Sequence, residues 1–335
     1  MSLDYPNNAN ASTLAAIKAK NLNITKDMNT RILFAIIICL CITNRTLSQC
    51  QEKNGVPFEM KKIAGKRPIF KASVNGFPAN LMFHSNASFY LQLNHAFASQ
   101  VGIDSLVSNG SFGISKPGKV SELGRDSANV SLLQVGINQL KNVPASIFEV
   151  PDGEINAGMA GVDWIKTNRI VIDYKKKKFF LNPKIETLEC LKAKLSKEKY
   201  ISIPIKFDSV RQRYLVKIEI GGLTRNFTLS TVAFTTIDSV FAVDLSLKIK
   251  NTGNSYGGPT GSVGFVYENT IPLIFSLVNH RYKINKLTIE DMYAYIKETR
   301  TKEKSENIGG ILGADFLVEH KAIIDFGNET LYLKE

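Results

Sequence analysis

The sequence carries its C-terminal motif twice. Segments 158–181 and 310–333 align over 24 residues without a gap, 152 positions apart, and share six identical residues. Upstream, the turn Asn75-Gly76 matches Gly221-Gly222 at an offset of 146. A repeat at one long period predicts two copies of one structural unit rather than a short-period solenoid. We expect the copies to pack as pseudo-symmetric lobes, with equivalent positions facing one another across a seam.

The repeated units have the residue pattern of strands. Short runs of β-branched and aromatic residues, separated by Gly, Asn and Pro, fill both copies and predict a mostly-β fold with short helices. We expect lobe 1 over 50–183 and lobe 2 over 200–335. Between them, the leucines of 184–199 recur at helical spacing and predict a connecting helix. At 335 residues the chain is long enough for two lobes with cores.

Residues 1–49 have a different composition. Arg31 precedes an apolar run over 32–42, and small polar residues follow up to Ser48. This order predicts a signal peptide cleaved after Ser48, and hence a secreted or periplasmic protein. Eleven apolar residues are short for a bilayer, so we expect no transmembrane span in the mature chain. Alternatives are a membrane anchor or buried segment, and lipoprotein acylation at Cys50 despite the bulky Gln49. Whether the signal starts at Met1 or at Met28, with the upstream residues as a leader, is open.

Two cysteines follow the predicted cleavage site, Cys50 and Cys190. In an oxidising compartment they could form a disulfide between the N-terminal arm and the segment that joins the lobes. Two separate buried thiols are the alternative.

The basic residues are scattered rather than clustered. The formal charge is +12, and the one basic run, Lys175–Lys178, falls where a solvated hairpin turn is expected. No nucleic-acid-binding motif occurs, so we expect no nucleic-acid partner. The four histidines lack the spacing of metal ligands, so neither a metal nor another cofactor is predicted.

Each copy also contains a glycine-rich stretch, over 108–119 in the first and 251–264 in the second. Such segments can form hairpins over a cleft. The candidate cleft or flap positions are Gly110, Gly113, Gly257, Gly258 and Gly261. A surface loop without a functional role is the alternative.

The closing motif resembles that of a known family. Gly310–Leu317 (GILGADFL) followed by Ala322–Phe326 (AIIDF) is similar to the last segment of the retropepsin-like aspartic proteases, in the arrangement with two lobes in one chain. The resemblance implies two pseudo-symmetric retropepsin-like (acid protease) β-barrel lobes around a central cleft. It also implies a monomer, because the lobes pair within one chain. In that family each lobe supplies an Asp, and the two carboxyl groups share a proton and activate a water.

This chain lacks both acids at those positions. Lobe 1 reads MFHSNAS over 82–88, so His84 stands at the aspartate position, and lobe 2 reads TLSTVA over 228–233, with Ser230 there. The two residues are 146 apart, the offset of the matched turns. No catalytic residue is therefore expected.

The residues that flank the two positions keep more of the family pattern. Ser85 and Thr231 retain the hydroxyl that ties the two loops together in the family. Asn86 and Val232 replace the family's glycine. Asn tolerates a positive φ, whereas Val does not, so we expect the second loop to have changed shape.

Other acids could in principle replace the lost pair. Asp163 and Asp315 are duplicated and fall where a short helix should begin, and Asp173 and Asp325 are duplicated at a strand-to-turn junction. We interpret all four as structural. Asp238 lacks a counterpart in lobe 1, so a displaced catalytic pair is not expected.

Three functional hypotheses remain open. The first is a catalytically degenerate aspartic-protease-fold protein that is exported and binds an extended peptide or protein segment between its lobes. The second is an active endopeptidase that uses displaced acids or a His84–Ser230 pair, in which the imidazole would deprotonate the hydroxyl. The third is a surface-interaction protein whose cleft is vestigial.

Overall fold

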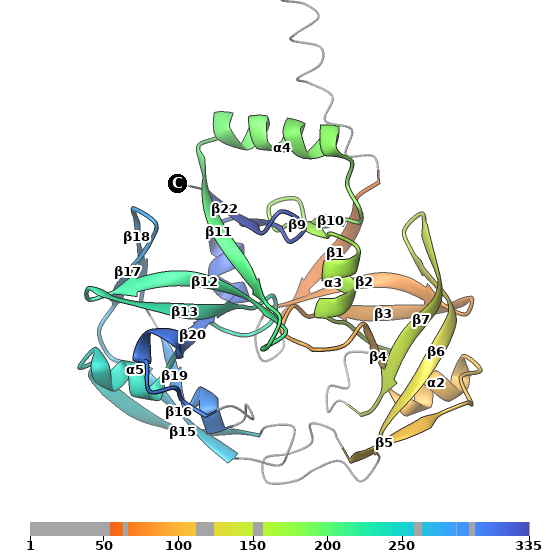
Figure 1. Cartoon of the computed structure of the whole chain (residues 1–335), viewed down its shortest axis with the longest axis horizontal. Helices are drawn as coiled ribbons and strands as arrows, with labels where there is room; N and C mark the ends of the chain where they lie inside the picture. Colours follow the sequence, from red (N-terminus) through yellow and green to blue (C-terminus); the bar gives the residue numbers. More distant parts are fainter. Residues whose placement is uncertain are drawn as a thin grey trace, which may run out of the picture. The chain divides into compact units, whose positions relative to one another are not determined.

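Two β-rich lobes lie side by side, and helix α4 (Ile185–Lys197) crosses the end of the molecule where they join (Figure 1). The computed structural model describes residues 54–62, 66–111, 124–149, 157–257, 263–285, 287–294 and 299–334. All of these residues belong to one compact unit, Glu52–Glu335. The mostly-β fold, the short helices and the connecting helix are confirmed. Within the described ranges, no helix is long and apolar enough to cross a membrane.

Lobe 1 is built from ten strands and two short helices in the described part of the chain. They are β1 (Val56–Lys61), β2 (Arg67–Val74), β3 (Phe77–Phe83), β4 (Leu91–Leu93), α2 (His95–Gln100), β5 (Val107–Ser111), β6 (Gly124–Val135), β7 (Asn138–Ile147), β8 (Gly158–Ala160), α3 (Val162–Thr167), β9 (Val171–Asp173) and β10 (Lys178–Phe180).

Lobe 2 repeats this order with two strands divided. Its elements are β11 (Tyr200–Asp208), β12 (Arg213–Ile220), β13 (Leu223–Leu229), β14 (Thr236–Asp238), α5 (Ser239–Asp244), β15 (Ile249–Gly257), β16 (Val263–Asn269), β17 (Leu273–Leu277), β18 (His280–Ile284), β19 (Thr288–Glu290), η1 (Met292–Ala294), η2 (Lys304–Glu306), β20 (Ile308–Leu312), α6 (Ala314–Glu319), β21 (Ile323–Asp325) and β22 (Thr330–Lys334). Pro272, which has no N–H to donate, separates β16 from β17 where lobe 1 has the single strand β6.

A shared antiparallel sheet joins the lobes in the order β1-β10-β9-β21-β22-β11. At its centre Ile172 pairs with Ile324, its own counterpart 152 positions later, and Asp173 pairs with Ile323. The pseudo-twofold axis therefore passes through the Ile172–Ile324 pair. The duplication expected from the sequence is thus expressed as backbone symmetry.

One main core runs through both lobes. In lobe 1 the Trp164 ring stacks on Phe70 at 5.9 Å between centroids and meets Phe179 edge-on. Phe326 of lobe 2 contacts Phe83 of lobe 1 as well as Tyr214 of its own lobe. Aromatic rings of this size bury large apolar areas, so these contacts hold the lobes together as well as stabilising each one.

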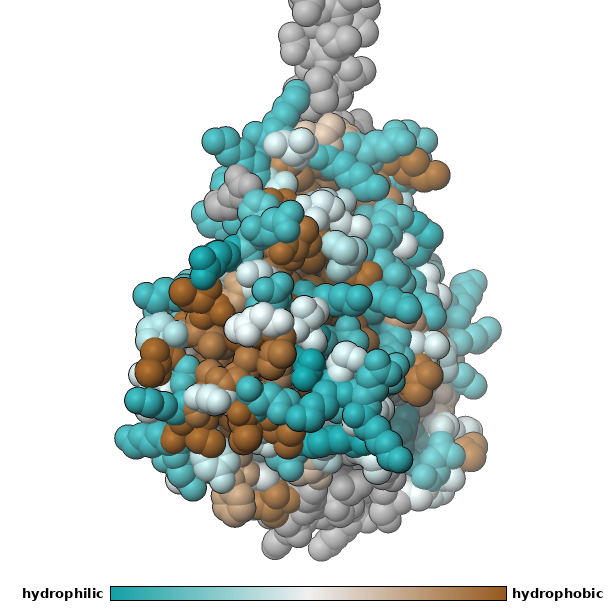
Figure 2. Space-filling view, turned by 60° about the vertical axis from the view of Figure 1, so that its left-hand side comes forward, coloured by the Kyte–Doolittle hydropathy of each residue, from teal (hydrophilic) through white to brown (hydrophobic). Residues whose placement is uncertain are grey.

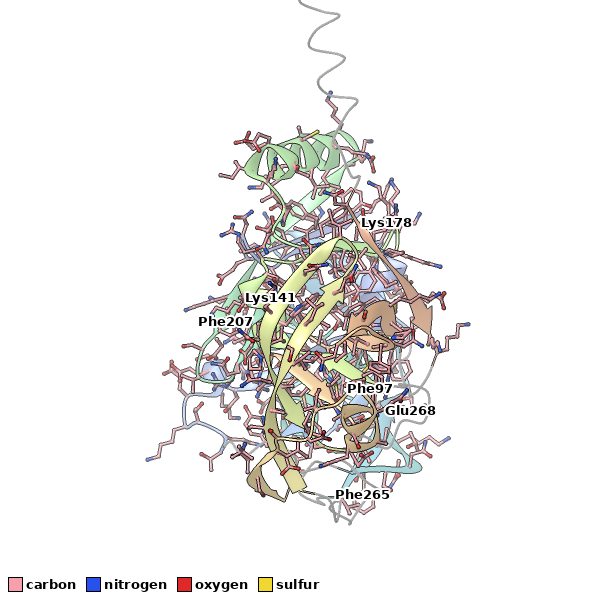
Figure 3. All side chains as sticks on the ribbon, turned by 90° about the vertical axis from the view of Figure 1, so that its right-hand side faces the viewer. Phe97, Lys141, Lys178, Phe207, Phe265 and Glu268 are labelled. Atoms are coloured by element: carbon pink, nitrogen blue, oxygen red, sulfur yellow. The ribbon has the colours of Figure 1, made fainter. Side chains whose placement is uncertain are left out.

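The described parts of the glycine-rich stretches lie in two antiparallel strand pairs, which we call hairpins. Hairpin 1 consists of β5 and β6, and hairpin 2 consists of β15 and β16. Both lie at the end of the molecule opposite α4 (Figure 1). Seen from the side of lobe 1, Phe265 of hairpin 2 lies at that lower end and Lys178 lies near α4 (Figure 3).

Candidate functional site at the seam between the lobes

Two equivalent loops meet at the seam, which we define by residues 84–87 of lobe 1 and 230–233 of lobe 2. Each loop follows a strand that pairs in parallel with a later strand of its own lobe. In lobe 1 these strands are β3 and β8, and in lobe 2 they are β13 and β20. The His84 N–H donates to Ala160 O at 2.9 Å, and the Ser230 N–H donates to Leu312 O at the same distance. His84 and Ser230 are therefore structural counterparts, as their 146-residue offset predicted.

Four reciprocal hydrogen bonds, which we call the grip, cross the seam. The Ser85 N–H donates to Thr231 Oγ1 at 3.0 Å, and the Thr231 N–H donates to Ser85 Oγ at 3.1 Å. Each hydroxyl also donates to a backbone carbonyl of the other lobe, Ser85 to Leu229 and Thr231 to Phe83, at 3.0 Å. Both side chains are fully buried. The hydroxyls therefore do tie the loops together.

The His84 ring is turned toward its own loop. The backbone N–H of Asn86 donates to His84 Nδ1 at 3.2 Å, so Nδ1 is unprotonated and the neutral ring carries its proton on Nε2. Burial, and secondarily the positive charge of Arg67, lower the pKa of His84 to about 4. The imidazole is therefore neutral near pH 7, and its remaining nitrogen is a donor.

Ser230 is also occupied by its own loop. Its Oγ accepts the N–H groups of Val232 at 3.3 Å and Ala233 at 3.0 Å, and the residue is fully buried. Among the described residues no hydrogen bond joins Ser230 to His84. A general base must present an unprotonated nitrogen to the hydroxyl it activates. With Nδ1 of His84 held by Asn86, the geometry does not assemble a Ser-His pair.

The backbone has an ordinary conformation at the two positions where the family has glycine. Neither Asn86 nor Val232 has a positive φ, although eleven other non-glycine residues of the described ranges do. The N–H of each residue instead donates to the side chain two positions earlier, on His84 or Ser230. Such side-chain turns need no left-handed residue, so a β-branched Val is accommodated.

The duplicated acids serve the fold. Asp315 Oδ1 accepts both the N–H and the hydroxyl of Thr235 at 2.8 Å, in the first turn of α6. Asp173 and Asp325 accept backbone N–H groups three residues later in their hairpin turns, both at 2.9 Å. Asp163 lies in the first turn of α3. The structural interpretation of these four residues agrees with these contacts.

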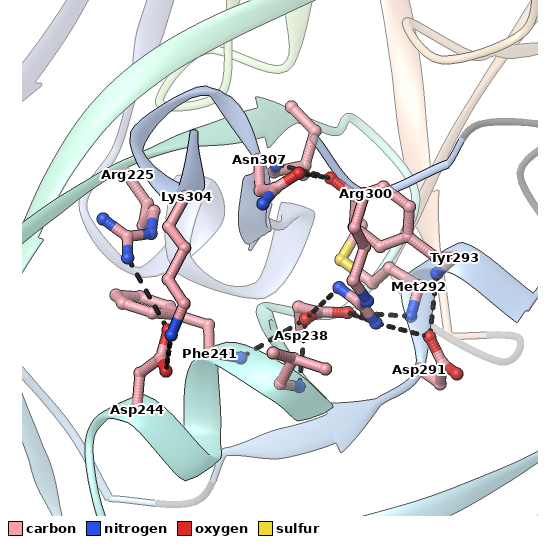
Figure 4. A network of polar contacts seen from close by, with 12 residues as sticks. Arg225, Asp238, Phe241, Asp244, Asp291, Met292, Tyr293, Arg300, Lys304 and Asn307 are labelled. Atoms are coloured by element: carbon pink, nitrogen blue, oxygen red, sulfur yellow. Dashed lines mark hydrogen bonds and ion pairs between the residues drawn. The ribbon is translucent and has the colours of Figure 1, made fainter. Parts of the chain in front are cut away.

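Asp238, itself buried, is the centre of a polar network (Figure 4). Its carboxylate caps α5 by accepting the N–H groups of Val240 and Phe241. It also binds the Arg300 guanidinium through two contacts, at 2.6 and 3.0 Å. Arg300 in turn pairs with Asp291 at 2.8 Å and lies over the Tyr293 ring at 4.0 Å. A carboxylate that accepts this many hydrogen bonds holds the surrounding segments together, and its oxygens are already occupied by protein donors.

Comparison with known proteins identifies the architecture. No family model matches the sequence, and no curated protein matches it. Among solved structures, the aspartic proteinase from Irpex lacteus superposes with a TM-score of 0.50 at 12% identity, covering 84% of this chain and 96% of that one.

The chain has an aspartic-proteinase fold. At 12% identity the comparison establishes the fold and leaves the chemistry to the residues at the seam. Catalysis by the aspartic-protease mechanism needs two titratable carboxyl groups at this position. The loops of this chain supply an imidazole and a hydroxyl there, on His84 and Ser230.

Two charged residues near this frame were missed by our sequence analysis. Arg67, at the start of β2, gave no motif signal, yet its charge acts on His84. Glu290 ends β19, which pairs with β16 of hairpin 2 and aligns Glu290 with Val266. Burial raises the pKa of Glu290 to about 7. Glu290 directly precedes a loop and belongs to no repeated or periodic pattern in the sequence. Its burial is therefore visible only in the fold.

The hairpins and the cysteines are described only in part. Gly110 has a φ of +85° in β5, and Gly257 ends β15. The other candidate flap residues, Gly113, Gly258 and Gly261, lie outside the described residues.

Cys190 on α4 is disulfide-bonded, and its partner lies outside the described residues. The pairing with Cys50 stays a prediction. In the described part of the chain, no three or more His, Cys, Asp or Glu side chains come together as they would to hold a metal ion.

Proposed function

We propose that this chain is a non-catalytic, retropepsin-like protein with an aspartic-proteinase fold, which holds an extended peptide segment between its lobes. The observation that carries the proposal is the commitment of His84 Nδ1 and Ser230 Oγ to N–H groups of their own loops. A neutral ring and a buried hydroxyl cannot divide the roles of acid and base as two coupled carboxyl groups do.

Peptide holding rests on parts of the frame that do not need the acids. The grip keeps the two loops in register. Each lobe also extends a hairpin at the end opposite α4 (Figure 1). Extended peptides bind such surfaces by main-chain hydrogen bonds, with pockets for alternate side chains. This mode of binding can persist after catalysis is lost.

We further propose that the protein is exported. The disulfide at Cys190 supports this, because structural disulfides persist in oxidising compartments. Mass spectrometry of the mature N-terminus would test it, with cleavage after Ser48 as the expected result. An N-terminus at Met1 or Met28 in the functional protein would contradict export by a cleaved signal.

A proteolysis assay separates this proposal from an active endopeptidase. We expect no cleavage of an unstructured protein substrate at any pH between 3 and 8. Should cleavage occur and be abolished by His84→Ala, the non-catalytic assignment would be overturned. Asp291→Asn serves as a parallel variant, because Asp291 is an exposed acid of lobe 2 whose loss should leave the protein folded.

A second assay tests peptide holding. We expect members of an extended-peptide library to bind the intact protein and to lose binding when 251–264 of hairpin 2 is replaced by a two-residue turn. Folding of the shortened protein is checked by circular dichroism. Binding that is unchanged by this truncation would contradict the proposal.

One observation favours the vestigial-cleft alternative. Ten of the 15 exposed large apolar side chains of the described residues belong to lobe 2. Apolar residues gather on the lower part of that lobe (Figure 2). Exposed apolar area of this kind marks interaction surfaces. If a bound protein were released by Val243→Lys on α5 and not by shortening hairpin 2, the outer surface would be the functional one.

A further inference from the structure

A small apolar cluster lies beside the seam, apart from the main core. It contains Ile69, Met82 and Met159 of lobe 1, with Phe89 packed against it. Met82 pairs with Ile69 on one side and with Met159 on the other, so the three side chains form a row across neighbouring strands. Their neighbours Leu81 and Phe83 belong to the main core. Because side chains alternate along a strand, this row faces the opposite side of β3.

The cluster is completed by one residue from the other lobe. Val232 of lobe 2 packs with the three lobe 1 side chains and is only 8% exposed. It follows Thr231 directly, so the grip fixes its backbone at the seam. Met82 lies two residues before His84. The Val232 side chain therefore covers an apolar floor next to the place where catalytic acids would stand.

Lobe 2 closes its matching cluster differently. Leu215 and Ile311, the counterparts of Ile69 and Met159, pack with Ile308 and with Met292. Tyr293 lies against this cluster and comes from the same lobe. Asn86, the counterpart of Val232, has a polar side chain and so adds no apolar group to this cluster. All apolar members of the lobe 2 cluster thus come from lobe 2, whereas the lobe 1 cluster includes one side chain, Val232, from across the seam.

We propose that Val232 is the residue that sets specificity for the held peptide, by restricting the position over the lobe 1 floor to small side chains such as Gly, Ala or Ser. This inference rests on the proposed function. An extended segment at the seam directs alternate side chains toward the floor. A large ligand side chain would need the volume that the two Val232 methyl groups fill, and interiors packed at this density do not yield it without strain.

The test uses fluorescence polarisation with a set of extended peptides in which each position in turn is Gly, Ala, Val, Leu or Phe. The natural protein is expected to bind best with a small residue at one position. Val232→Ala should raise the affinity for Leu at that position by about tenfold or more, since a methylene in an apolar pocket changes affinity by about that factor. The nearly isosteric Val232→Thr should retain the small-residue preference.

A matched control and a second readout locate the effect. Val240→Ala removes the same two methyl groups from the exposed face of α5 and should leave the preference unchanged. In Val232→Ala labelled with ¹³C-methyl methionine, a Leu peptide should shift the Met82 and Met159 resonances. An unaltered preference in folded Val232→Ala, or a shift of neither methionine, overturns this inference while peptide holding stands. Failure of every variant to bind any peptide overturns both.

Discussion

The two lobes have the same order of elements and each contributes one hydroxyl to the grip, yet they differ in the polar residues at the start of the helix that follows β4 or β14. In lobe 1 the helix after β4 begins at Asn94, whose side chain makes no capping hydrogen bond. In lobe 2 the matching position is Asp238, which caps α5 and binds Arg300. The backbone plan therefore does not dictate which polar groups are buried. Each lobe stabilises the same junction through the residues that its own loops supply.

The connection that precedes β8 in lobe 1 and β20 in lobe 2 explains this difference. It spans 17 residues in lobe 2 (291–307) and ten in lobe 1 (148–157). Only the longer connection brings an arginine back to the helix cap, through Arg300. A buried carboxylate is tolerable when a partner of this kind satisfies it, and costly otherwise. Loop length and buried charge are therefore linked.

The largest expected effect tests this link. Asp238→Asn leaves the Arg300 guanidinium without its buried partner and weakens the α5 cap, so we expect a loss of about 3–5 kcal/mol in unfolding free energy. Asp291→Asn removes the exposed partner of the same arginine and should cost less than about 1 kcal/mol. Urea unfolding measures both. Equal losses would mean that burial does not distinguish the two contacts.

A slightly smaller effect tests the part of the lobes that is the same. Thr231→Val keeps side-chain shape but leaves the Ser85 N–H and the Phe83 carbonyl unpaired, at a cost of about 2–4 kcal/mol. Ser85→Ala should cost a similar amount, because it frees the equivalent groups in the other lobe. A large disparity between the two variants would show that the grip is not energetically symmetric.

His84 gives lobe 1 a pH response. Because its pKa is lowered from 6.5 to about 4 in the folded state, protons bind the unfolded chain preferentially as pH falls from 6.5 to 4. The natural protein should therefore lose about 2 kcal/mol between pH 7.5 and 4.5 relative to His84→Asn, whose amide oxygen can still accept the Asn86 N–H. Stability curves of the two proteins that stay parallel would contradict this assignment.

Glu290 gives lobe 2 the opposite response, of about the same size as that of His84 because the two pKa shifts are equally large. Its pKa is raised from 4.5 to about 7, so the unfolded chain releases its proton first as pH rises. Relative to Glu290→Gln, the natural protein should lose up to about 2 kcal/mol between pH 4.5 and 7.5. In the natural protein the two pH dependences of the unfolding free energy largely cancel. Each single variant should reveal the pH dependence that comes from the other residue.

The sequence alone predicted the parts that repetition or local pattern determines. The shared offset of 146 placed His84 against Ser230 and Ser85 against Thr231, because a duplicated backbone preserves spacing. The leucines of the connecting segment predicted α4, which buries Leu188 and Leu195.

Contacts between distant segments could not be predicted. Arg300 lies 62 residues after Asp238, in a loop without periodicity, so no pattern links them. The burial of Val232 depends on side chains of the other lobe. The turn at Val232, in which the Ser230 hydroxyl accepts its N–H at an ordinary φ, could not be read from residue preferences alone. These features depend on tertiary packing, which local residue preferences do not determine.

The pairing of Ile172 with Ile324 has a consequence for the history of such a chain. A strand whose register maps onto itself can pair with a second copy of its own lobe and keep every ladder hydrogen bond. The architecture is thus compatible with an ancestral homodimer of single lobes that was later fused into one gene. Fusion frees each half to diverge, and a valine at one loop no longer has to appear at both.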